Sequence, residues 1–284
     1  MSTLALIAGN GSLPFLVARA YKAKAEHRVV AVGFKGDTDP ALAALVDDFS
    51  WIGVGQLGRL IARFKKAGAE EAVMAGQITP TRLFAKVAFD ARGLKVFAGL
   101  KNRKADTIFG AVAAELAKDG IRLVDSTRYL DEHLAAEGVL TRTQPGTAQV
   151  EDVVFGAEIA RELGGLDIGQ TVVVKNRAVV AVEAIEGTNE TIARAGRLGG
   201  EGTVVVKMAK PKQDMRFDVP VIGPKTIEVM AEAKAAVIAV EAKRTLVVEP
   251  EATVAAADGQ GVCVMAIPAD FSTSSWKGEG RHGD

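Results

Sequence analysis

The sequence predicts an α/β protein, with an N-terminal, Rossmann-like parallel-sheet domain followed by a C-terminal domain of mixed α/β (α+β) type. Three observations predict this class. Short apolar runs alternate with helical patterns through the first half of the chain, as in a doubly wound sheet. The runs are too continuous in apolar residues for a sheet with one solvated face. Glycine-bearing loops follow three of them, at the edge where ligands bind in such sheets.

The bulk composition favours two globular domains. The 284 residues exceed what most single hydrophobic cores contain. Hydrophobic residues make up 48% and charged residues 25%, which argues against a disordered or coiled-coil chain. Lysine plus arginine and aspartate plus glutamate each number 35, so no global field attracts nucleic acid. A neutral chain with a valine-rich second half also permits a homodimer.

The location of the protein is predicted from its apolar runs. None approaches the roughly 18 residues needed to span a bilayer. The N-terminal apolar stretch lacks a basic leader and stops at Gly9, so we interpret it as a first strand and not as a signal peptide. We therefore expect a cytoplasmic protein that is at most peripheral to a membrane.

Five strands and four helices are predicted in the first half. The strands are expected over residues 4–8, 29–34, 49–52, 72–75 and 122–124. The helices are expected over residues 13–24, 40–46, 57–67 and 106–118. A segment rich in Gly, Thr and Pro then follows at 137–146, and it ends the first domain near residue 134.

The second domain, residues 135–270, alternates helical and strand patterns less regularly. A helix is predicted over 149–163, a hairpin over 170–174 and 178–184, a strand over 203–207 and a helix over 226–234, with another helix after Glu190 and further short valine-rich strands. The last segment, 271–284, is polar and rich in Gly and Ser, so we expect a flexible tail.

Three loops at the predicted carboxyl edge of the first sheet carry glycine. They begin at Gly9, Gly53 and Gly76. The first runs Gly-Asn-Gly-Ser-Leu-Pro, so backbone amides and a helix that Ser12 caps can hold a phosphate or a sugar hydroxyl. An ordinary tight turn is the alternative. Pro14 replaces the third glycine of a dinucleotide fingerprint and no P-loop motif exists, which disfavours both of those classes.

The residue types and motifs that the chain lacks argue against several classes of catalytic mechanism. It has three histidines, none at metal-ligand spacing, which argues against zinc hydrolases and binuclear metallophosphatases. The one cysteine, Cys263, lies in an apolar run and is expected to be a buried strand residue. Ser12 lacks a nucleophile elbow. Carboxylates, amides and cations remain as candidate catalytic groups.

The loop after the strand over 203–207 concentrates such groups. Four cations and two carboxylates lie between Lys207 and Pro220. Asp214 and Asp218, four residues apart, can hold a hard divalent cation, while the neighbouring cations neutralise phosphoryl oxygens. The alternative is a solvated charged loop. A second acidic stretch, Glu183 to Glu190, is explained equally well by helix capping or by carboxylates that face the same cleft.

Motifs from both halves together resemble the LpxI family of bacterial UDP-2,3-diacylglucosamine pyrophosphatases of lipid A synthesis. The resemblance covers residues 4–267 in order. It rests on seven motifs: Leu6 to Pro14, Gly55 to Gly58, Met74 to Gly76, Gly138 to Thr141, Asp167 to Gln170, Ala184 to Thr188 and Lys210 to Pro220. The last motif is long enough to be specific.

The resemblance implies a hydrolase that splits a sugar-nucleotide pyrophosphate with the assistance of Mg²⁺. Water attacks the sugar-side phosphorus, and the products are UMP and 2,3-diacylglucosamine 1-phosphate (lipid X). Asp214 and Asp218 match the family's acidic pair and are the implied catalytic and metal-binding residues, with Asp218 the more critical. The implied first domain binds the nucleotide, and the second binds the acylated sugar.

The remaining site residues are assigned by the same resemblance. Those on the nucleotide side are Gly11, Ser12, Gly53, Gly76 and Thr79. Those on the sugar or lipid side are Gln170, Thr188 and Asn189, and those offsetting pyrophosphate charge are Lys207, Lys210 and Arg216. The implied partners are the lipid-linked nucleotide sugar and, transiently, the inner membrane or the next lipid A enzyme. We further expect the domains to close around the substrate, with 137–145 as hinge.

Two other functions stay open at this stage. A carrier that only binds an acylated or nucleotide sugar needs no acidic pair beside cations. A hydrolase or transferase of another nucleotide sugar would differ only in its substrate.

Overall fold

The computed structural model of the protein divides into two compact units. It describes residues 2–23, 26–78, 88–102 and 104–276. The first unit contains the chain up to Glu132 together with Asp214–Asp218, and the second contains His133–Gln213 and the chain from Val219 onward. The boundary between Glu132 and His133 thus lies two residues before the predicted boundary between residues 134 and 135. The segment Asp214–Asp218, which we expected in the second domain, belongs to the first unit.

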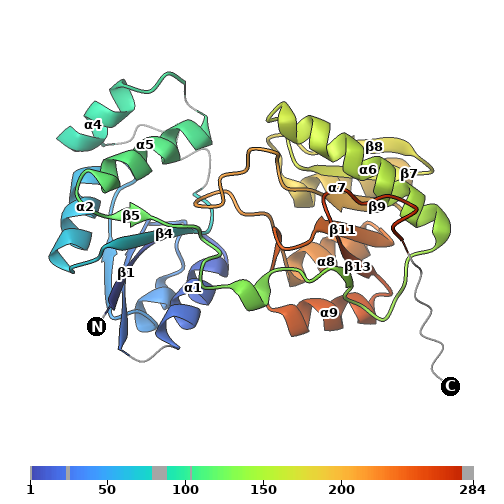
Figure 1. Ribbon diagram of the computed structural model, residues 1–284, viewed down its shortest axis with the longest axis horizontal. Coiled ribbons are helices and arrows are strands. Elements are labelled where there is room, and N and C mark those ends of the chain that lie inside the picture. The colour runs from blue at the N-terminus through green and yellow to red at the C-terminus, as the bar shows by residue number, and fades with distance from the viewer. Residues whose placement is uncertain (1, 24–25, 79–87, 103, 277–284) are drawn as a thin grey trace. The chain divides into compact units, whose positions relative to one another are not determined.

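The first unit is built on a five-stranded parallel sheet of order β3-β2-β1-β4-β5 (Figure 1). Its strands are β1 (Ser2–Ala8), β2 (His27–Gly33), β3 (Asp48–Trp51), β4 (Glu71–Ala75) and β5 (Arg122–Leu123). Its helices are α1 (Leu13–Lys22), α2 (Leu57–Lys66), α4 (Ala91–Ala98) and α5 (Ala105–Ala117), with 3₁₀ turns at Pro40–Ala44 and Asp131–His133. The predicted parallel sheet is confirmed. The helix α4 was not predicted, and the helix predicted over 40–46 is a 3₁₀ turn.

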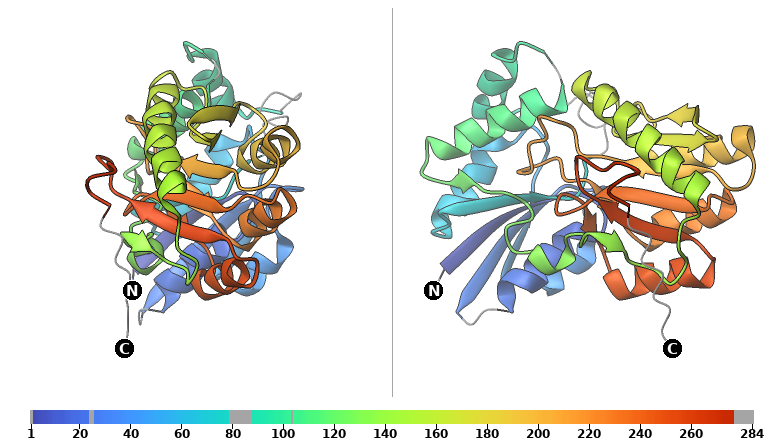
Figure 2. Two further views of the ribbon diagram at one scale, coloured as in Figure 1. Left: turned by 90° about the vertical axis from the view of Figure 1, so that its right-hand side faces the viewer. Right: turned by 45° about the vertical axis from the view of Figure 1, so that its right-hand side comes forward.

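Alternate side chains of the central strands bury opposite faces of this sheet. Ala5 and Ile7 of β1 and Val30 and Val32 of β2 pack with the apolar faces of α2 and α5. Figure 2 shows helices on both sides of the sheet. Burial on both faces explains the uninterrupted apolar runs in the sequence.

The second unit contains a six-stranded mixed sheet of order β6-β13-β11-β9-β7-β8. Its strands are β6 (Gly138–Val139), β7 (Thr171–Lys175), β8 (Ala178–Val182), β9 (Val204–Lys207), β11 (Val237–Glu241) and β13 (Cys263–Ile267). The strands β9, β11 and β13 run parallel, whereas β6, β7 and β8 pair antiparallel with their neighbours. A separate parallel pair joins β10 (Val221–Ile222) and β12 (Leu246–Val247). The prediction of a mixed second domain is confirmed.

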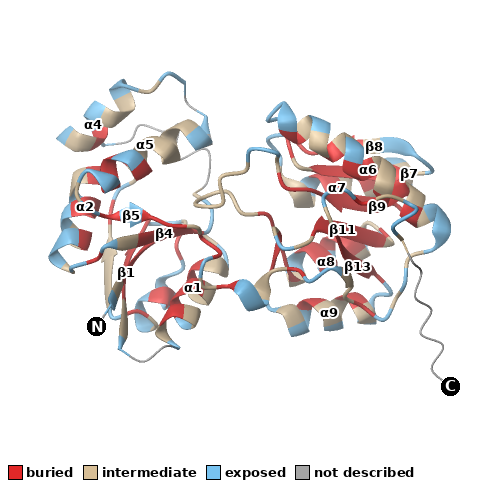
Figure 3. Ribbon diagram, in the orientation of Figure 1, coloured by how far each residue is buried: buried red, intermediate tan, exposed pale blue. Residues whose placement is uncertain are grey.

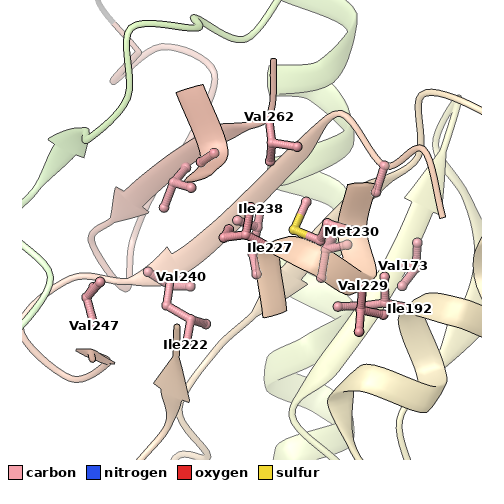
Figure 4. Close-up of a cluster of buried hydrophobic side chains, with 14 of the residues drawn as sticks. Val173, Ile192, Ile222, Ile227, Val229, Met230, Ile238, Val240, Val247 and Val262 are labelled. Carbon is pink, nitrogen blue, oxygen red and sulfur yellow. The ribbon is translucent and has the colours of Figure 1, made fainter. Parts of the chain in front are cut away.

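Four helices cover the two faces of this sheet. They are α6 (Thr147–Gly165), α7 (Thr188–Gly199), α8 (Pro224–Glu232) and α9 (Pro250–Gly259). Val172 and Val174 face α6, while Val173 between them faces the cluster formed with α7, α8 and α9 (Figure 4). The interiors of β7, β9, β11 and β13 are buried on both faces, whereas the edge strand β8 is partly exposed (Figure 3). None of the helices among the described residues is both long and apolar enough to cross a membrane.

The last described residues differ from the predicted flexible tail. Phe271 is 9% exposed and packs on the core beside Trp276, with the ring centroids 6.2 Å apart. Apolar burial of these two rings therefore holds the start of the tail, and residues 277–284 lie outside the described residues. Cys263 is buried in β13, as predicted, and burial raises the pKa of its thiol to about 11.

Candidate active site

The loops that follow β1 and β4 lie side by side. The Gly9 amide donates to Ala75 O (2.7 Å), and the Asn10 amide donates to Gln77 O (2.8 Å). The Gln77 amide in turn donates to Asn10 Oδ1 (3.2 Å). The strand order reverses between β1 and β4, because the chain moves outward through β2 and β3 and then returns to β4. This is the topological switch point, where open α/β sheets bind their ligands.

Two glycines make this close approach possible. A Cβ at Gly9 would lie 2.6 Å from Gln77 O, and one at Gly76 would overlap Asn10 O. Gly76 also has φ of +80°, in the region that favours glycine. Gly9 and Gly76 therefore serve backbone contact between the loops.

We expect Gly76→Ala to lower the free energy of unfolding. The decrease should exceed the cost of backbone strain at a positive φ, which is about 1–3 kcal/mol. The added methyl group must displace Asn10 as well as adopt a positive φ. Gly68→Ala is the matched control, because Gly68 has φ of +69° with nothing within 4 Å of its Cβ position. Urea unfolding of both variants measures the difference, and equal losses would contradict the proposed packing role of Gly76.

The other described residues predicted on the nucleotide side, Gly11, Ser12 and Gly53, lie at the same edge of the sheet. Gly11 is exposed with φ of +80°, and Ser12 precedes α1 without a capping hydrogen bond from its side chain, contrary to the predicted cap. Gly53 follows β3, two strands away from β1, and its amide donates to Gln56 Oε1 (3.0 Å). Thr79 lies outside the described residues.

The acidic segment Asp214–Asp218 packs on this same unit. Ser126, just after β5, donates its amide to Met215 O (3.0 Å), and its hydroxyl lies 2.8 Å from Arg216 O. Phe217 packs against the core of the first unit, with its ring centroid 5.6 Å from that of Phe109. These contacts are the physical reason that the segment belongs with the first unit and not, as predicted, with the second.

A compact turn fixes the two carboxylates relative to each other. The Asp218 amide donates to Asp214 O (3.0 Å). Arg216 forms a two-point ion pair with Asp214, through Nε to Oδ1 (2.8 Å) and Nη2 to Oδ2 (2.6 Å). The Arg216 hydrogen bonds hold the pKa of Asp214 below its ordinary value of 3.8. The pair therefore stabilises the fold fully above that value, and its contribution is lost as the pH falls through the lowered pKa.

The donor set of this turn suits a hard cation in part. Mg²⁺ prefers oxygen ligands and is commonly bound through one or two protein carboxylates together with substrate phosphates. The turn supplies two carboxylates, and both oxygens of Asp214 already accept hydrogen bonds from Arg216. Among the described residues, no group of three or more His, Cys, Asp or Glu side chains is arranged for a metal. A cation here would therefore compete with Arg216 for Asp214 and would need further ligands from the substrate.

A second polar cluster lies inside the second unit, around the N-terminus of α7. Lys207 Nζ donates to Thr188 Oγ1 (2.8 Å), and Thr188 Oγ1 donates to Glu183 Oε1 (3.0 Å). Thr171 Oγ1 is a further 3.2 Å neighbour of the Thr188 hydroxyl. Lys207 is 6% exposed and Glu183 is 7% exposed. Thr188 thus bridges a buried ammonium and a buried carboxylate.

The structure brings several predicted sugar-side residues to this cluster. The Gln170 amide donates to Glu183 Oε2 (3.3 Å), and Gln170 Oε1 is buried without a partner among the described residues. Asn189 is the second residue of α7. Lys210 lies elsewhere, paired with Asp167 at 3.0 Å.

Two residues with structural roles next to the acidic loop escaped prediction. Ser126 is one. The other is Glu241, a buried carboxylate at the end of β11 that accepts a hydrogen bond from the Ala209 amide (2.9 Å). Glu241 carried a sequence signal, because it ends an otherwise apolar strand. Ser126 carried none.

Comparison with known proteins identifies relatives over nearly the whole chain. The family model described as LpxI N-terminal domain matches residues 3–133, and the one described as LpxI C-terminal domain matches residues 136–265. UDP-2,3-diacylglucosamine pyrophosphatase LpxI of Caulobacter vibrioides is 34% identical over 279 residues, covering 94% of this chain and 98% of that protein. A solved structure of CobK precorrin-6A reductase aligns over 94% of this chain and 88% of its own, at 13% identity. Its TM-score of 0.29 supports no argument about fold or function.

Proposed function

The chain belongs to the LpxI family, and from that premise we propose that it hydrolyses the pyrophosphate of UDP-2,3-diacylglucosamine in lipid A biosynthesis. The products are UMP and 2,3-diacylglucosamine 1-phosphate. A relative that carries this activity in its name shares 34% of its residues over 94% of the chain. The structural observation that carries the proposal is the packing of Asp214–Asp218 on the unit that contains the β1/β4 switch point.

The proposed reaction is an in-line displacement at the sugar-side phosphorus. Water forms the new P–O bond while the bond from that phosphorus to the bridging oxygen breaks, and UMP leaves with the bridging oxygen. Asp218 orients the water and accepts its proton. Asp214 and Arg216 form a pair of zero net charge that holds the turn in shape.

We propose that Mg²⁺ is held by Asp218 and, to a smaller degree, by Asp214. When bound, it neutralises charge on phosphoryl oxygens, which the substrate supplies as further ligands. The backbone amides of Gly11, Ser12 and Gly76 are proposed to orient the nucleotide, the first two in the manner of phosphate sites at helix N-termini, while the amides of Gly9, Asn10 and Gln77 hold the two loops together.

Residues of the second unit are proposed to contact the acylated sugar. Gln170, Thr188 and Asn189 lie around the start of α7, where amide and hydroxyl groups can bond sugar hydroxyls. Lys207 is buried and bonded to Thr188, so it acts on the sugar side through Thr188. For Lys210 to neutralise charge on the phosphates, as proposed, its side chain would have to break the ion pair with Asp167. The family's lipid substrate also motivates the proposal of transient contact with the inner membrane or the next lipid A enzyme, and the neutral chain with its valine-rich second half motivates that of a homodimer.

Product analysis tests the function directly. The full chain is incubated with UDP-2,3-diacylglucosamine or with UDP-N-acetylglucosamine, each with Mg²⁺ or with excess chelator. We expect UMP from the diacylated compound alone, and loss of UMP release on chelation. Release from both sugars would favour a hydrolase of broader specificity. Binding without release would favour a carrier.

A further inference from the structure

Ser126 joins three segments of the first unit that are distant in sequence. Its side chain is 1% exposed, two residues beyond Val124 at the end of the β5 region. Its hydroxyl lies 2.5 Å from Met74 O in β4 and 2.8 Å from Arg216 O in the acidic segment. Its amide donates to Met215 O (3.0 Å). One buried serine thus ties the backbone of the acidic segment to the parallel sheet.

The acidic segment depends on such ties because its flanks belong elsewhere. Gln213 before it and Val219 after it are part of the second unit. Ordering the backbone of each residue costs about 1–2 kcal/mol, which contacts of the segment must offset. The described contacts with the first unit include the two hydrogen bonds of Ser126 and the packing of Phe217. Each contributes on the order of the cost of ordering one residue.

Ser126 is connected to Asp218 through Arg216, which lies two residues before Asp218 in the same turn. Ser126 contacts Arg216 O. The next residue, Phe217, packs against the core of the first unit, and Asp218 follows it. The Asp218 amide closes the turn onto Asp214 O. A displacement at Arg216 therefore displaces the Asp218 carboxylate.

We propose that Ser126 is a positioning residue for the Asp214–Asp218 segment: its hydroxyl, whose one proton is shared between Met74 O and Arg216 O, ties Arg216 to β4 and thereby sets the place of the Asp218 carboxylate relative to the ends of β4 and β5. The inference rests on the proposed function for its effect on hydrolysis. Its effect on the order of the segment is independent of any activity. Ser126 need not touch the substrate to act in this way.

The test compares Ser126→Ala with a matched deletion elsewhere. Ser126→Ala removes the hydroxyl but keeps the amide bond to Met215. Thr253→Val is the control, because Thr253 is also fully buried and donates its hydroxyl to a carbonyl, Val248 O at 2.7 Å, within the second unit. Three quantities are measured: kcat and KM for UMP release, amide hydrogen exchange at Phe217 and Asp218, and urea stability.

We expect Ser126→Ala to lower kcat about tenfold, the factor that corresponds to one lost hydrogen bond, with KM changed less than twofold. Exchange at the Phe217 and Asp218 amides rises by a similar factor. Thr253→Val loses comparable stability but keeps wild-type kcat and wild-type exchange in the segment. Wild-type kcat and exchange in folded Ser126→Ala would overturn the proposal, as would an equal loss of kcat in Thr253→Val.

A second variant covers the outcome in which Ser126→Ala does not fold. Ser126→Cys keeps a weaker donor at the same position, so kcat is expected to fall and segment exchange to rise together, by less than tenfold. Wild-type values of both in Ser126→Cys would overturn the proposal. If the wild-type chain releases no UMP, the proposed function fails, while the exchange measurement still decides whether Ser126 orders the segment.

Discussion

Asp218→Asn is expected to lower kcat for UMP release by about 10²–10⁴-fold, the usual contribution of a positioned general base. Asparagine keeps the size and shape of the side chain but accepts no proton near neutral pH. Substrate affinity is expected to stay within a few-fold of wild type, because the proposed nucleotide and acyl-sugar contacts lie on other residues. Steady-state UMP release and calorimetric binding to the full chain measure the two effects separately.

Asp39→Asn provides the matched control for this substitution. Asp39 is an exposed carboxylate of the same unit that caps the 3₁₀ turn, accepting a hydrogen bond from the Ala41 amide (2.8 Å), and asparagine caps equally well. We expect wild-type kinetics from this variant. An Asp218→Asn enzyme that released UMP at the wild-type rate would remove Asp218 from the mechanism.

Lys207→Met is expected to destabilise the second unit by about 1–3 kcal/mol, the usual cost of leaving a buried polar group without its hydrogen-bond partner. Methionine matches the length of the lysine stem but provides no positive charge. Glu183 then remains 7% exposed, and Thr188 no longer connects it to an ammonium group. Chemical unfolding followed by near-ultraviolet circular dichroism measures the loss.

A double variant tests whether the loss comes from the stranded carboxylate. Adding Glu183→Gln to Lys207→Met is expected to recover part of the stability, because the buried negative charge is removed as well. Lys225→Met is the surface control, since Lys225 and Glu228 form an exposed pair, and it should produce no measurable change. A double variant as unstable as the sum of its two single variants would show that Lys207 and Glu183 are not coupled.

The strands of the first unit could be predicted because a parallel sheet covered on both faces leaves continuous apolar runs. Strands of two residues, such as β6, β10 and β12, could not, because two residues carry no periodicity. The neighbourhood of the loops after β1 and β4 was also predictable from parallel strand order. Helix α4 was not predictable, because the sequence pattern around residues 91–98 indicated neither a helix nor a strand.

The position of the acidic segment could not be predicted for a different reason. Its docking depends on Ser126 and Arg216, which are 90 positions apart, and no local pattern reports such a contact. Lys207 was more accessible to prediction. It follows three buried valines in β9, a strand buried on both faces, so burial of its stem was foreseeable even though its bond to Thr188 was not.

The central claim is that the acidic segment and the loops after β1 and β4 act as one site on the first unit. Amide hydrogen exchange of the full-length Asp218→Asn protein, with and without UDP-2,3-diacylglucosamine, tests it most directly. We predict simultaneous protection of the amides of Asn10, Gln77 and Asp214–Asp218 on binding. Protection confined to second-unit amides such as those of Thr188 and Lys207, with the first-unit loops unchanged, would contradict the claim.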